Sequence, residues 1–521
     1  MSEQQPLMLS EVAQKEKRKL RKELSLFFMV CFTLTAMINI DTLGAVSSQG
    51  GQVFPWLLIT ALTFLIPYGL LTAELGSTFP EEGGIYVWCK LAGGRLFAAI
   101  ASIFYWVSNP LWVGGTLAVT TIAALKTFWF GNSDLLFGGN KTIDAIVEIV
   151  IALIFIWFTT WSAIVSLRIG KWFSTIGIIL KLSLLGLFVI LALAFFFGGK
   201  ASGAHLSWRD LLPTTNLGLI FSSIIPVLVF NWAGFELQNG AGEEMFEPQR
   251  DVPRSLLRAG TIGVLAYAIP ILVILLALPK DQLSNVGGFL DAYQVVASIL
   301  PAPLATALGW LIAAALILTL ASAGGTWLMG ADRTYAVTAL DGAAPVVLGR
   351  FSSYFGTPLA MNLLSGSVAT VAMVAAILVT AFGSGELSTL FSLVLGFTIS
   401  TTALSYAFIF ISYIVLRYKY PEVERPYRVP GGMVGPWIVT LLALVSVLVT
   451  AYFTLIPTDE TVSSYQISRL TYELTQLLPI AIVLVVAVIF YLWGRFEQRR
   501  LTTGDLVGEA VADQAAGSSL Q

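Results

Sequence analysis

The chain has little charge and few of the residue types that build soluble catalytic or metal sites. Only 12% of its 521 residues are charged, against about 25% in an average soluble domain. His205 is the only histidine, which excludes a histidine-based metal site or catalytic triad. The two cysteines, Cys31 and Cys89, have no zinc-binding spacing, and we expect no disulfide between them. No metal and no cofactor are therefore predicted.

Apolar residues are abundant instead, at 56% of the chain, with 33 Phe and 14 Trp. A helix that crosses a bilayer needs about 20 apolar residues. The formal net charge is −2, and the charged residues are segregated by loop, so no nucleic-acid partner is expected. The sequence predicts an all-α membrane protein with twelve spans, at 24–49, 53–75, 95–125, 143–167, 171–198, 216–244, 255–279, 303–329, 358–382, 386–416, 434–456 and 475–494.

The distribution of Lys and Arg predicts the orientation of these spans. If the N-terminus is cytoplasmic, 22 of the 29 basic residues fall in cytoplasmic segments, six fall outside, and Lys181 lies within a span. This excess follows the positive-inside rule. It predicts a multi-pass protein of the cytoplasmic membrane with both termini in the cytoplasm. The basic N-terminal run is expected to precede an uncleaved first span.

The first and sixth spans are both interrupted halfway. The first reads LSLFFMVCFTLTAM and then INIDTLGAVSSQ, and the sixth reads NLGLIFSSIIPVLVF and then NWAGFELQNGAGEE. Asp41 and Glu236 lie at the interruptions, where a carboxylate costs at least roughly 2.5 kcal/mol unless it faces a cavity or a polar partner. Matching broken helices in two halves of a chain are typical of the binding site of a secondary transporter.

Because the chain completes five spans, an odd number, between the start of the first broken span and the start of the sixth, the second five-span unit must enter the membrane in the opposite direction. We therefore predict a 5+5 inverted repeat. The predicted organisation is a basic cytoplasmic segment, two repeats, two further spans and a cytoplasmic tail expected to be disordered, at 1–23, 24–198, 216–416, 434–494 and 495–521.

A helix broken in mid-membrane leaves backbone N–H and C=O groups that must line a cavity or bind a ligand. The half-helix N-terminus suits a carboxylate and the opposing C-terminal end suits an ammonium group. We place the breaks near Asn39–Gly44 and Asn231–Glu236. The alternative is that both are kinks packed inside the bundle. Glu74, Glu243 and Glu244 are expected at solvated helix ends.

Four segments resemble motifs of the amino acid/polyamine/organocation (APC) superfamily, in register along most of the chain. ELGSTFPEEGGIYVW from Glu74 looks like the superfamily's loop after span 2, and FNWAGFELQNGAGEEMFEPQRDVPRSL (230–256) like its span 6 and following loop. ADRTYAVTALDGAAP (331–345) with GTP (356–358) is similar to its loop after span 8, and ERPYRVPGG (424–432) to its loop after span 10. An acid in the span 1 break and EEGG after span 2 resemble the glutamate/GABA-antiporter-like branch.

The resemblance implies a leucine-transporter-type fold with alternating access to a central site. Phe230 matches an aromatic gate over the substrate, Glu236 an acid near the inner gate, and Trp327 a site-lining tryptophan of span 8. Bilayer or core packing is the alternative for each aromatic residue. The substrate-binding candidates are Asn39, Ile40, Asp41, Thr42, Gly44, Phe230, Asn231, Trp232, Ala233, Gly234, Glu236 and Trp327.

The span 1 break departs from the superfamily pattern. Many amino acid carriers have a GxG there that cradles the substrate carboxylate, whereas this chain has NIDTLG, with only Gly44 left. Asp41 could meet a substrate amine instead, which favours a cationic amine.

Lys181 lies about ten residues into span 5, or about 15 Å, near mid-membrane. An ammonium group buried there can lose its proton. In related carriers a lysine here occupies the place of a sodium ion and is linked to proton coupling. The alternative is a purely structural lysine.

Three functions are weighed. The leading one is secondary transport of a small amino acid, by exchange or with a proton, and the second is transport of a polyamine or organic cation by the same fold. A membrane enzyme or a channel is the third, but the longest loops, such as 330–357, hold no nucleophile–base pair. We therefore predict a transporter and not an enzyme, whose partners are its substrate and the lipid bilayer. The sequence leaves open whether it acts as a monomer or a homodimer.

Overall fold

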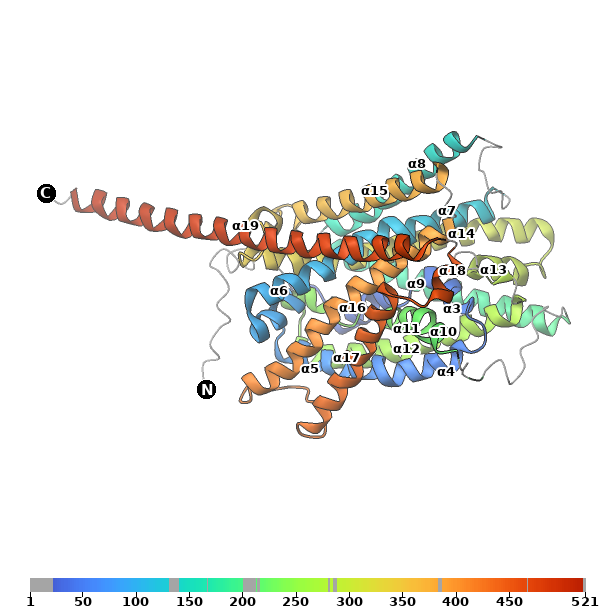
Figure 1. The fold of residues 1–521 in the computed structure, drawn as a ribbon, viewed down its shortest axis with the longest axis horizontal. Coiled ribbons are helices and arrows are strands. Elements are labelled where there is room, and N and C mark those ends of the chain that lie inside the picture. Colours follow the sequence, from blue (N-terminus) through green and yellow to red (C-terminus); the bar gives the residue numbers. More distant parts are fainter. Residues whose placement is uncertain are drawn as a thin grey trace.

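The computed structural model describes residues 22–130, 140–165, 167–199, 212, 216–279, 282–283, 288–382, 387–465 and 467–518. These residues form an elongated bundle of helices that run mostly along its length (Figure 1). Most of the predicted N-terminal segment 1–23 and the last three residues of the predicted tail lie outside the described residues. So does His205.

The first half of the bundle contains five crossings, of which the first is interrupted after Met37. They are built from α2 (Leu26–Met37), η1 (Ile40–Thr42), α3 (Leu43–Ser47), α4 (Val53–Thr60), η2 (Ala61–Leu65), α5 (Ile66–Thr78), α6 (Ile85–Trp112), η3 (Val113–Leu117), α7 (Ala118–Phe128), α8 (Lys141–Ile164) and α9 (Leu167–Phe197).

The second half begins with an interrupted segment and continues with long helices. It comprises α10 (Leu217–Leu219), η5 (Ile220–Ile224), α11 (Ile225–Asn231), η6 (Leu237–Glu244), α12 (Pro248–Ala277), α13 (Gly288–Ala297), α14 (Ala302–Leu340), η8 (Val346–Gly349), α15 (Leu359–Phe382), α16 (Leu387–Lys419), α17 (Val434–Leu455), α18 (Asp459–Ser464) and α19 (Arg469–Ser518).

Eleven helices within the described ranges are long and apolar enough to cross a membrane. They correspond to eleven of the twelve predicted spans, so the protein is a multi-pass membrane protein. The remaining prediction, span 6, is represented by the shorter apolar helix Leu217–Asn231. This segment falls short of a full span because the chain leaves α-helical geometry after Asn231 and continues as the 3₁₀ helix η6.

Three elements differ from the predicted boundaries. α13 was not predicted, because a helix of ten residues is too short to register as a span. α14 continues to Leu340, so the first ten residues of the segment expected as a loop from 331 are helical. α19 continues to Ser518 and extends beyond the other helices (Figure 1), where we expected a disordered tail. Residues 495–518 contain no proline to stop a helix.

One end of the bundle carries the helix ends that hold Lys90, Arg95, Arg333 and Arg417, and we call it the basic end. The connections 79–84, 245–247, 341–358 and 420–433 lie at this end, and ion pairs described below join three of them to neighbouring helices. The chain enters the bundle here, since Leu24 forms a β-bridge with Met245. Glu23 and Leu24 donate their backbone N–H groups to the carbonyl oxygen of Glu244 at 2.8 and 2.9 Å. The start of the first crossing is thus fixed to the end of η6.

Candidate functional site

The first crossing is interrupted where α2 ends. Ile38 and Asn39 adopt extended backbone angles, and the helix resumes through η1 and α3. The break therefore starts slightly before the predicted window Asn39–Gly44. Lys181 of α9 donates hydrogen bonds to the carbonyl oxygens of Thr35, at 3.0 Å, and of Ile38. An ammonium group at the C-terminal end of a half-helix satisfies orphan carbonyls and meets the negative end of the helix dipole.

Two aromatic side chains satisfy the remaining backbone groups of this break. The indole Nε1 of Trp327, on α14, donates to the carbonyl oxygen of Ala36 at 2.9 Å. The hydroxyl of Tyr267, on α12, donates to the carbonyl oxygen of Met37 at 2.7 Å and accepts from the N–H of Asn39 at 2.8 Å. The break is thus held open by side chains from three other crossings.

Asp41 lies in this break and is 3% exposed. Its Oδ2 accepts a hydrogen bond from the indole of Trp112 at 3.0 Å. Its Oδ1 has no hydrogen-bond partner among the described residues. Lys181 lies close enough for its charge to attract the Asp41 carboxylate. The break therefore contains both an amine and a carboxyl group, and one oxygen of that carboxyl group makes no hydrogen bond within the described residues.

A polar contact joins the two breaks. The hydroxyl of Thr42 lies 2.7 Å from Oδ1 of Asn231, the last residue of α11, and 2.9 Å from the carbonyl oxygen of Asn39. Oδ1 of Asn39 and Nδ2 of Asn231 are buried and make no hydrogen bond within the described part of the chain. The two asparagines therefore present one acceptor and one donor where the broken crossings meet.

The second break covers residues 232–236, as predicted from Asn231–Glu236. Gly234 has φ +119°, a conformation that residues with a side chain rarely adopt. The backbone N–H groups of Gly234, Phe235 and Glu236 all point at the hydroxyl of Tyr68, at 3.3, 2.9 and 3.3 Å. Tyr406 also accepts from Gly234, at 3.2 Å. Two tyrosines thus replace the lost helical acceptors.

Glu236 follows this turn and is 1% exposed. The hydroxyls of Tyr105 and Tyr406 both donate to its Oε1 at 2.9 Å. Its Oε2 has no hydrogen-bond partner in the part of the chain that the structure describes. Like Asp41, Glu236 therefore has one oxygen that binds the protein and one that is unpaired among the described residues.

Aromatic rings connect the two carboxylates. The ring of Trp112 lies 6.3 Å from those of Phe230 and Trp327, and Trp327 lies 6.3 Å from Tyr105. Trp112 binds Asp41 and Tyr105 binds Glu236. These two residues are seven apart on α6, or about 10.5 Å along the helix axis. Since α6 starts at the basic end, Glu236 lies nearer to that end than Asp41 does.

Most predicted candidates gather at the two breaks, but two of them point elsewhere. Gly44 lies in α3 and packs against Gly288 of α13. A Cβ added to Gly288 would lie 3.0 Å from the Cα of Gly44. Trp232 donates to Thr60 of α4 at 3.0 Å and packs on Tyr267. Ile40 and Ala233 are buried in the breaks. Sequence reasoning missed the hydroxyl and indole groups that hold the site, on Tyr68, Tyr105, Trp112, Tyr267 and Tyr406.

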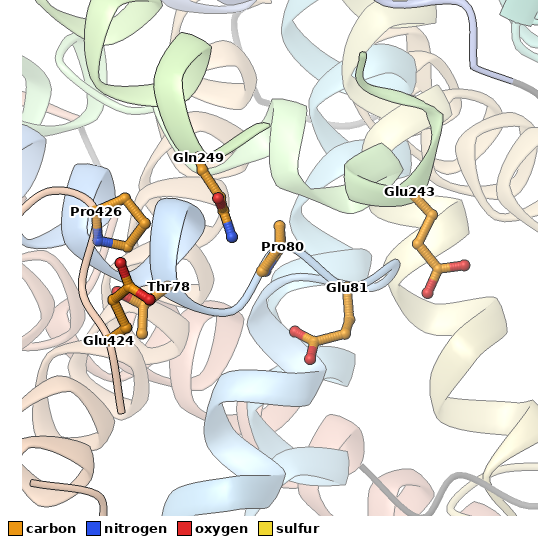
Figure 2. Close-up of a pocket in the computed structure, with 7 residues that line it drawn as sticks. All are labelled: Thr78, Pro80, Glu81, Glu243, Gln249, Glu424 and Pro426. Atoms are coloured by element: carbon orange, nitrogen blue, oxygen red, sulfur yellow. The ribbon is translucent and has the colours of Figure 1, made fainter. Parts of the chain in front are cut away.

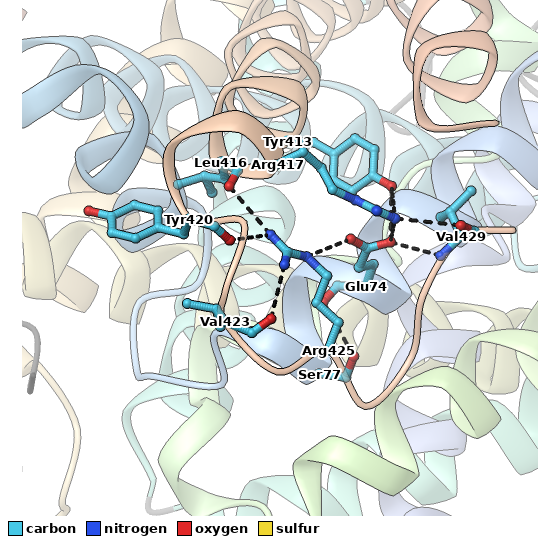
Figure 3. Close-up of polar contacts among 9 residues, drawn as sticks. All are labelled: Glu74, Ser77, Tyr413, Leu416, Arg417, Tyr420, Val423, Arg425 and Val429. Carbon is cyan, nitrogen blue, oxygen red and sulfur yellow. Dashed lines mark hydrogen bonds and ion pairs between the residues drawn. The ribbon is translucent and has the colours of Figure 1, made fainter. Parts of the chain in front are cut away.

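Glu74 was expected at a solvated helix end, and this expectation was wrong. Glu74 is 2% exposed, and Arg417 and Arg425 form ion pairs with its carboxylate at 2.5 and 3.1 Å (Figure 3). The hydroxyl of Tyr413 and the N–H of Val429 also donate to it, at 3.0 and 2.8 Å. A buried carboxylate requires such partners. Glu74 thereby ties α5 to α16 and to the connection after α16.

A second buried ion-pair group closes the basic end. Arg333 of α14 pairs with Glu82 at 3.1 Å and with Glu244, and the three side chains are 1%, 1% and 5% exposed. Glu244 was also expected to be solvated, and this was wrong. Nearby, Lys90 and Arg95 of α6 pair with buried Asp341 at 2.7 and 3.1 Å. Arg333 therefore joins α14 to the connection after α5 and to the end of η6, and Asp341 joins the connection after α14 to α6.

Two cavities flank the breaks along the bundle. At the basic end, a cavity of about 270 Å³ is lined by Glu81, Glu243 and Glu424 (Figure 2). Toward the other end, a cavity of about 70 Å³ is lined by residues of α3, η5 and α16, among them Ala45 and Ser222. The breaks lie between the cavity lined by glutamates and this second cavity.

Comparison with known proteins identifies the family. Residues 24–488 match the family Amino acid permease. The chain belongs to this permease family. Over 487 residues it is 30% identical to "Probable agmatine/putrescine antiporter AguD" of Lactococcus lactis subsp. lactis, covering 92% of this chain and 95% of the relative. It is 22% identical over 478 residues to the glutamate/gamma-aminobutyrate antiporter of the same organism, covering 88% of this chain and 90% of that protein.

A further relative is an uncharacterized transporter of Legionella pneumophila, 28% identical over 416 residues, or 79% of this chain and 85% of the relative. The predicted membership of the APC superfamily is confirmed. The permease is a transporter of amino acids or amines and not an enzyme, because its family and these named relatives are permeases and antiporters.

Proposed function

We propose that the permease is a secondary carrier that exchanges small cationic amines across the cytoplasmic membrane. The supporting observation is the pair of buried carboxylates at the breaks, Asp41 and Glu236, each with one oxygen unpaired among the described residues. A buried unpaired carboxylate oxygen is costly, and a substrate ammonium group would satisfy it. The aromatic rings between the two acids can also attract a cation.

The backbone donors favour an amine over an amino acid. A substrate carboxylate would bind the N–H groups exposed by the breaks. Here the N–H of Asn39 is bonded to Tyr267, and those of Gly234 to Glu236 are bonded to Tyr68. The sequence also lacks the glycine pair of many amino acid carriers. The relative with 30% identity is named as an agmatine/putrescine antiporter, in line with this proposal.

A small amino acid is the second candidate, and it is the substrate that the sequence put first. Two relatives at 22% identity are named as glutamate/gamma-aminobutyrate antiporters. The ammonium group of Lys181 at the first break is the cation that would meet a substrate carboxylate in this case.

We propose alternating access through twelve crossings, with the first and sixth broken and residues 24–198 and 216–416 forming an inverted repeat. The two breaks, from α2 to η1 and from α11 to η6, support this arrangement. We place the basic end and both termini in the cytoplasm, following the positive-inside rule. In this arrangement the ion pairs of Arg333 and Glu74 close the cytoplasmic side. Lys181 is the proposed coupling residue, since its charge interacts with that of Asp41.

Exchange in liposomes tests the substrate class. Vesicles loaded with unlabelled putrescine are expected to take up labelled putrescine or agmatine, and empty vesicles to take up much less. Glutamate, gamma-aminobutyrate and a neutral amino acid are offered in parallel. Uptake of these three without uptake of either amine would reject the amine proposal in favour of the second candidate. A steady current that no internal substrate stimulates would reject a carrier altogether.

A further inference from the structure

An apolar groove of about 480 Å³ lies between α5 and α12, and neither Asp41 nor Glu236 lines it. Its walls include Ile66 and Ala73 of α5 and Leu256 and Val264 of α12. At the basic end it is bordered by Arg254 and by Tyr427 of the connection after α16.

The groove opens toward the lipid-facing surface of the bundle. Ile66 and Leu257, which line it, are 50% and 73% exposed. On α12 it runs from Pro253 to Val264, eleven residue steps or about 16 Å. The hydrocarbon core of a bilayer is about 30 Å thick, so the groove covers about one leaflet. Its length therefore matches an acyl chain of a single leaflet.

The charge at the basic end of the groove is positive. Arg254 is exposed at the border, and Arg258 follows one turn later on α12 and is also exposed. Juxtamembrane arginines attract the anionic headgroups of the membrane surface. An apolar channel of leaflet length that ends at exposed arginines complements a phospholipid with a negative headgroup.

The groove also reaches the second break. Phe235, beside Glu236, forms part of its wall. The ring packs on two glycines, since a Cβ at Gly69 would lie 3.0 Å from Phe235 Cε2 and one at Gly260 would lie 3.2 Å from its Cζ. The side chain of the broken segment thus lies between α5 and α12, directly against whatever fills the groove.

We propose that this groove binds one acyl chain of an anionic phospholipid from the leaflet at the basic end, with the headgroup phosphate on Arg254. The bound chain packs against Phe235 and supports the geometry of the break that carries Glu236. Lipid binding stands independently of the substrate, whereas an effect on exchange rests on the proposed function.

Lipid binding can be measured directly on the purified permease, without substrate, by native mass spectrometry with phosphatidylglycerol or phosphatidylcholine. The wild type is expected to retain phosphatidylglycerol preferentially. Arg254→Gln is expected to weaken its binding about fivefold, the effect of one basic residue near a membrane surface. Thr261→Trp, which fills the groove from an exposed position on α12, is expected to reduce binding of both lipids.

Two matched variants control for nonspecific effects. Arg350→Gln removes an exposed arginine from another connection at the basic end, and Leu311→Trp adds bulk to an exposed position on α14. Both are expected to retain lipid as the wild type does. Equal retention of the two lipids by the wild type, or unchanged retention in Arg254→Gln and Thr261→Trp, would overturn the site. The lipid site would also be overturned if the wild type formed a dimer and Thr261→Trp dissociated it, because the groove would then be occupied by a second copy of the chain.

The effect on exchange is tested separately in vesicles of phosphatidylcholine with and without phosphatidylglycerol. The wild type and Leu311→Trp are expected to exchange putrescine faster in vesicles that contain phosphatidylglycerol, and Thr261→Trp is not. This result would support the role of the lipid in holding the geometry of the break. Equal rates in both vesicle types would overturn that role. Absence of exchange in every vesicle would count against the proposed function, and the mass measurement would still decide the lipid site.

Discussion

The ammonium group of Lys181 in α9 is hydrogen bonded to the carbonyl oxygen of Ile38, the residue that directly follows α2. A second bond joins it to Thr35 at 3.0 Å, and the side chain is 1% exposed. One lysine therefore satisfies the C-terminal end of the broken helix while its charge acts on Asp41. Its protonation state would alter both the break and the proposed amine site, in line with the proposed coupling role.

We expect Lys181→Ala to remove the dependence of uptake on pH, because the group that would exchange a proton between the two sides is lost. The measurement is initial uptake of labelled substrate into liposomes across a series of external pH values. Lys126→Ala is the control, since Lys126 of α7 pairs with Glu148 at 2.6 Å, away from the breaks. A pH profile unchanged in Lys181→Ala would leave Lys181 with a structural role only.

Asp41→Asn is expected to reduce transport while the protein remains in the membrane. The variant keeps the shape of the side chain but removes the charge that would bind a substrate ammonium group. A hydrogen bond to a charged group is worth roughly 1.5–3 kcal/mol, so KM should rise about 10- to 100-fold. Asp459→Asn, at a side chain 88% exposed, should leave KM unchanged. Wild-type kinetics in Asp41→Asn would reject this carboxylate as part of the site.

Glu236→Gln is expected to have an effect of similar size on uptake. Its Oε1 accepts from Tyr105 and Tyr406, and an amide oxygen can keep these two bonds, so the fold should survive. Uptake is compared at matched amounts of reconstituted protein. Glu422→Gln, at an exposed position in the connection after α16, is the control. If Glu236→Gln and Glu422→Gln both transport at the wild-type rate, Glu236 has no part in substrate binding.

The position of the breaks could be predicted from the sequence, because a carboxylate beside polar residues stands out in an apolar span. Asp41 and Glu236 carry that signal. The partners of the breaks could not be predicted in the same way. Tyr68 and Tyr406 are two among 16 tyrosines, and only the packing of α5 and α16 brings their hydroxyls to Gly234.

The buried state of Glu74 was mispredicted for a related reason. A carboxylate near the end of a span normally reaches water, and nothing near Glu74 in the sequence supplies a cation. Its partners, Arg417 and Arg425, lie more than 300 residues away in the chain. Long-range ion pairs of this kind are set by tertiary packing alone, so single-sequence reasoning about Glu74, Glu82 and Glu244 could not reach them.

Tyr68→Phe is expected to destabilise the second break. It removes the acceptor shared by the N–H groups of Gly234, Phe235 and Glu236. Unsatisfied buried donors cost about 1–3 kcal/mol, so the thermal midpoint in detergent should fall. Tyr293→Phe is the control, because the Tyr293 hydroxyl makes one long bond of 3.5 Å to Leu184. Equal midpoints for the two variants would show that the Tyr68 hydroxyl does not hold the break.

Arg333→Met is expected to be strongly destabilising, because it leaves the carboxylates of Glu82 and Glu244 buried without their cation. Removing one partner of a buried ion pair costs roughly 3–5 kcal/mol. Arg250→Met breaks an ion pair with Glu247 whose side chains are 58% and 57% exposed, and such surface pairs contribute at most about 1 kcal/mol. The thermal midpoints of the two variants should therefore differ clearly.

The triple variant Arg333→Met, Glu82→Gln, Glu244→Gln separates the charge effect from lost packing. In the triple variant both carboxylates are replaced by neutral amides, so no charge is left buried without Arg333. Its thermal midpoint should therefore recover most of the decrease caused by Arg333→Met. If it remains as unstable as Arg333→Met, the cost comes from the missing guanidinium contacts, including the bond to the Gly356 carbonyl at 3.4 Å. Because Arg333 joins α14 to the connection after α5 and to the end of η6, the same variants would also weaken the proposed closure of the basic end.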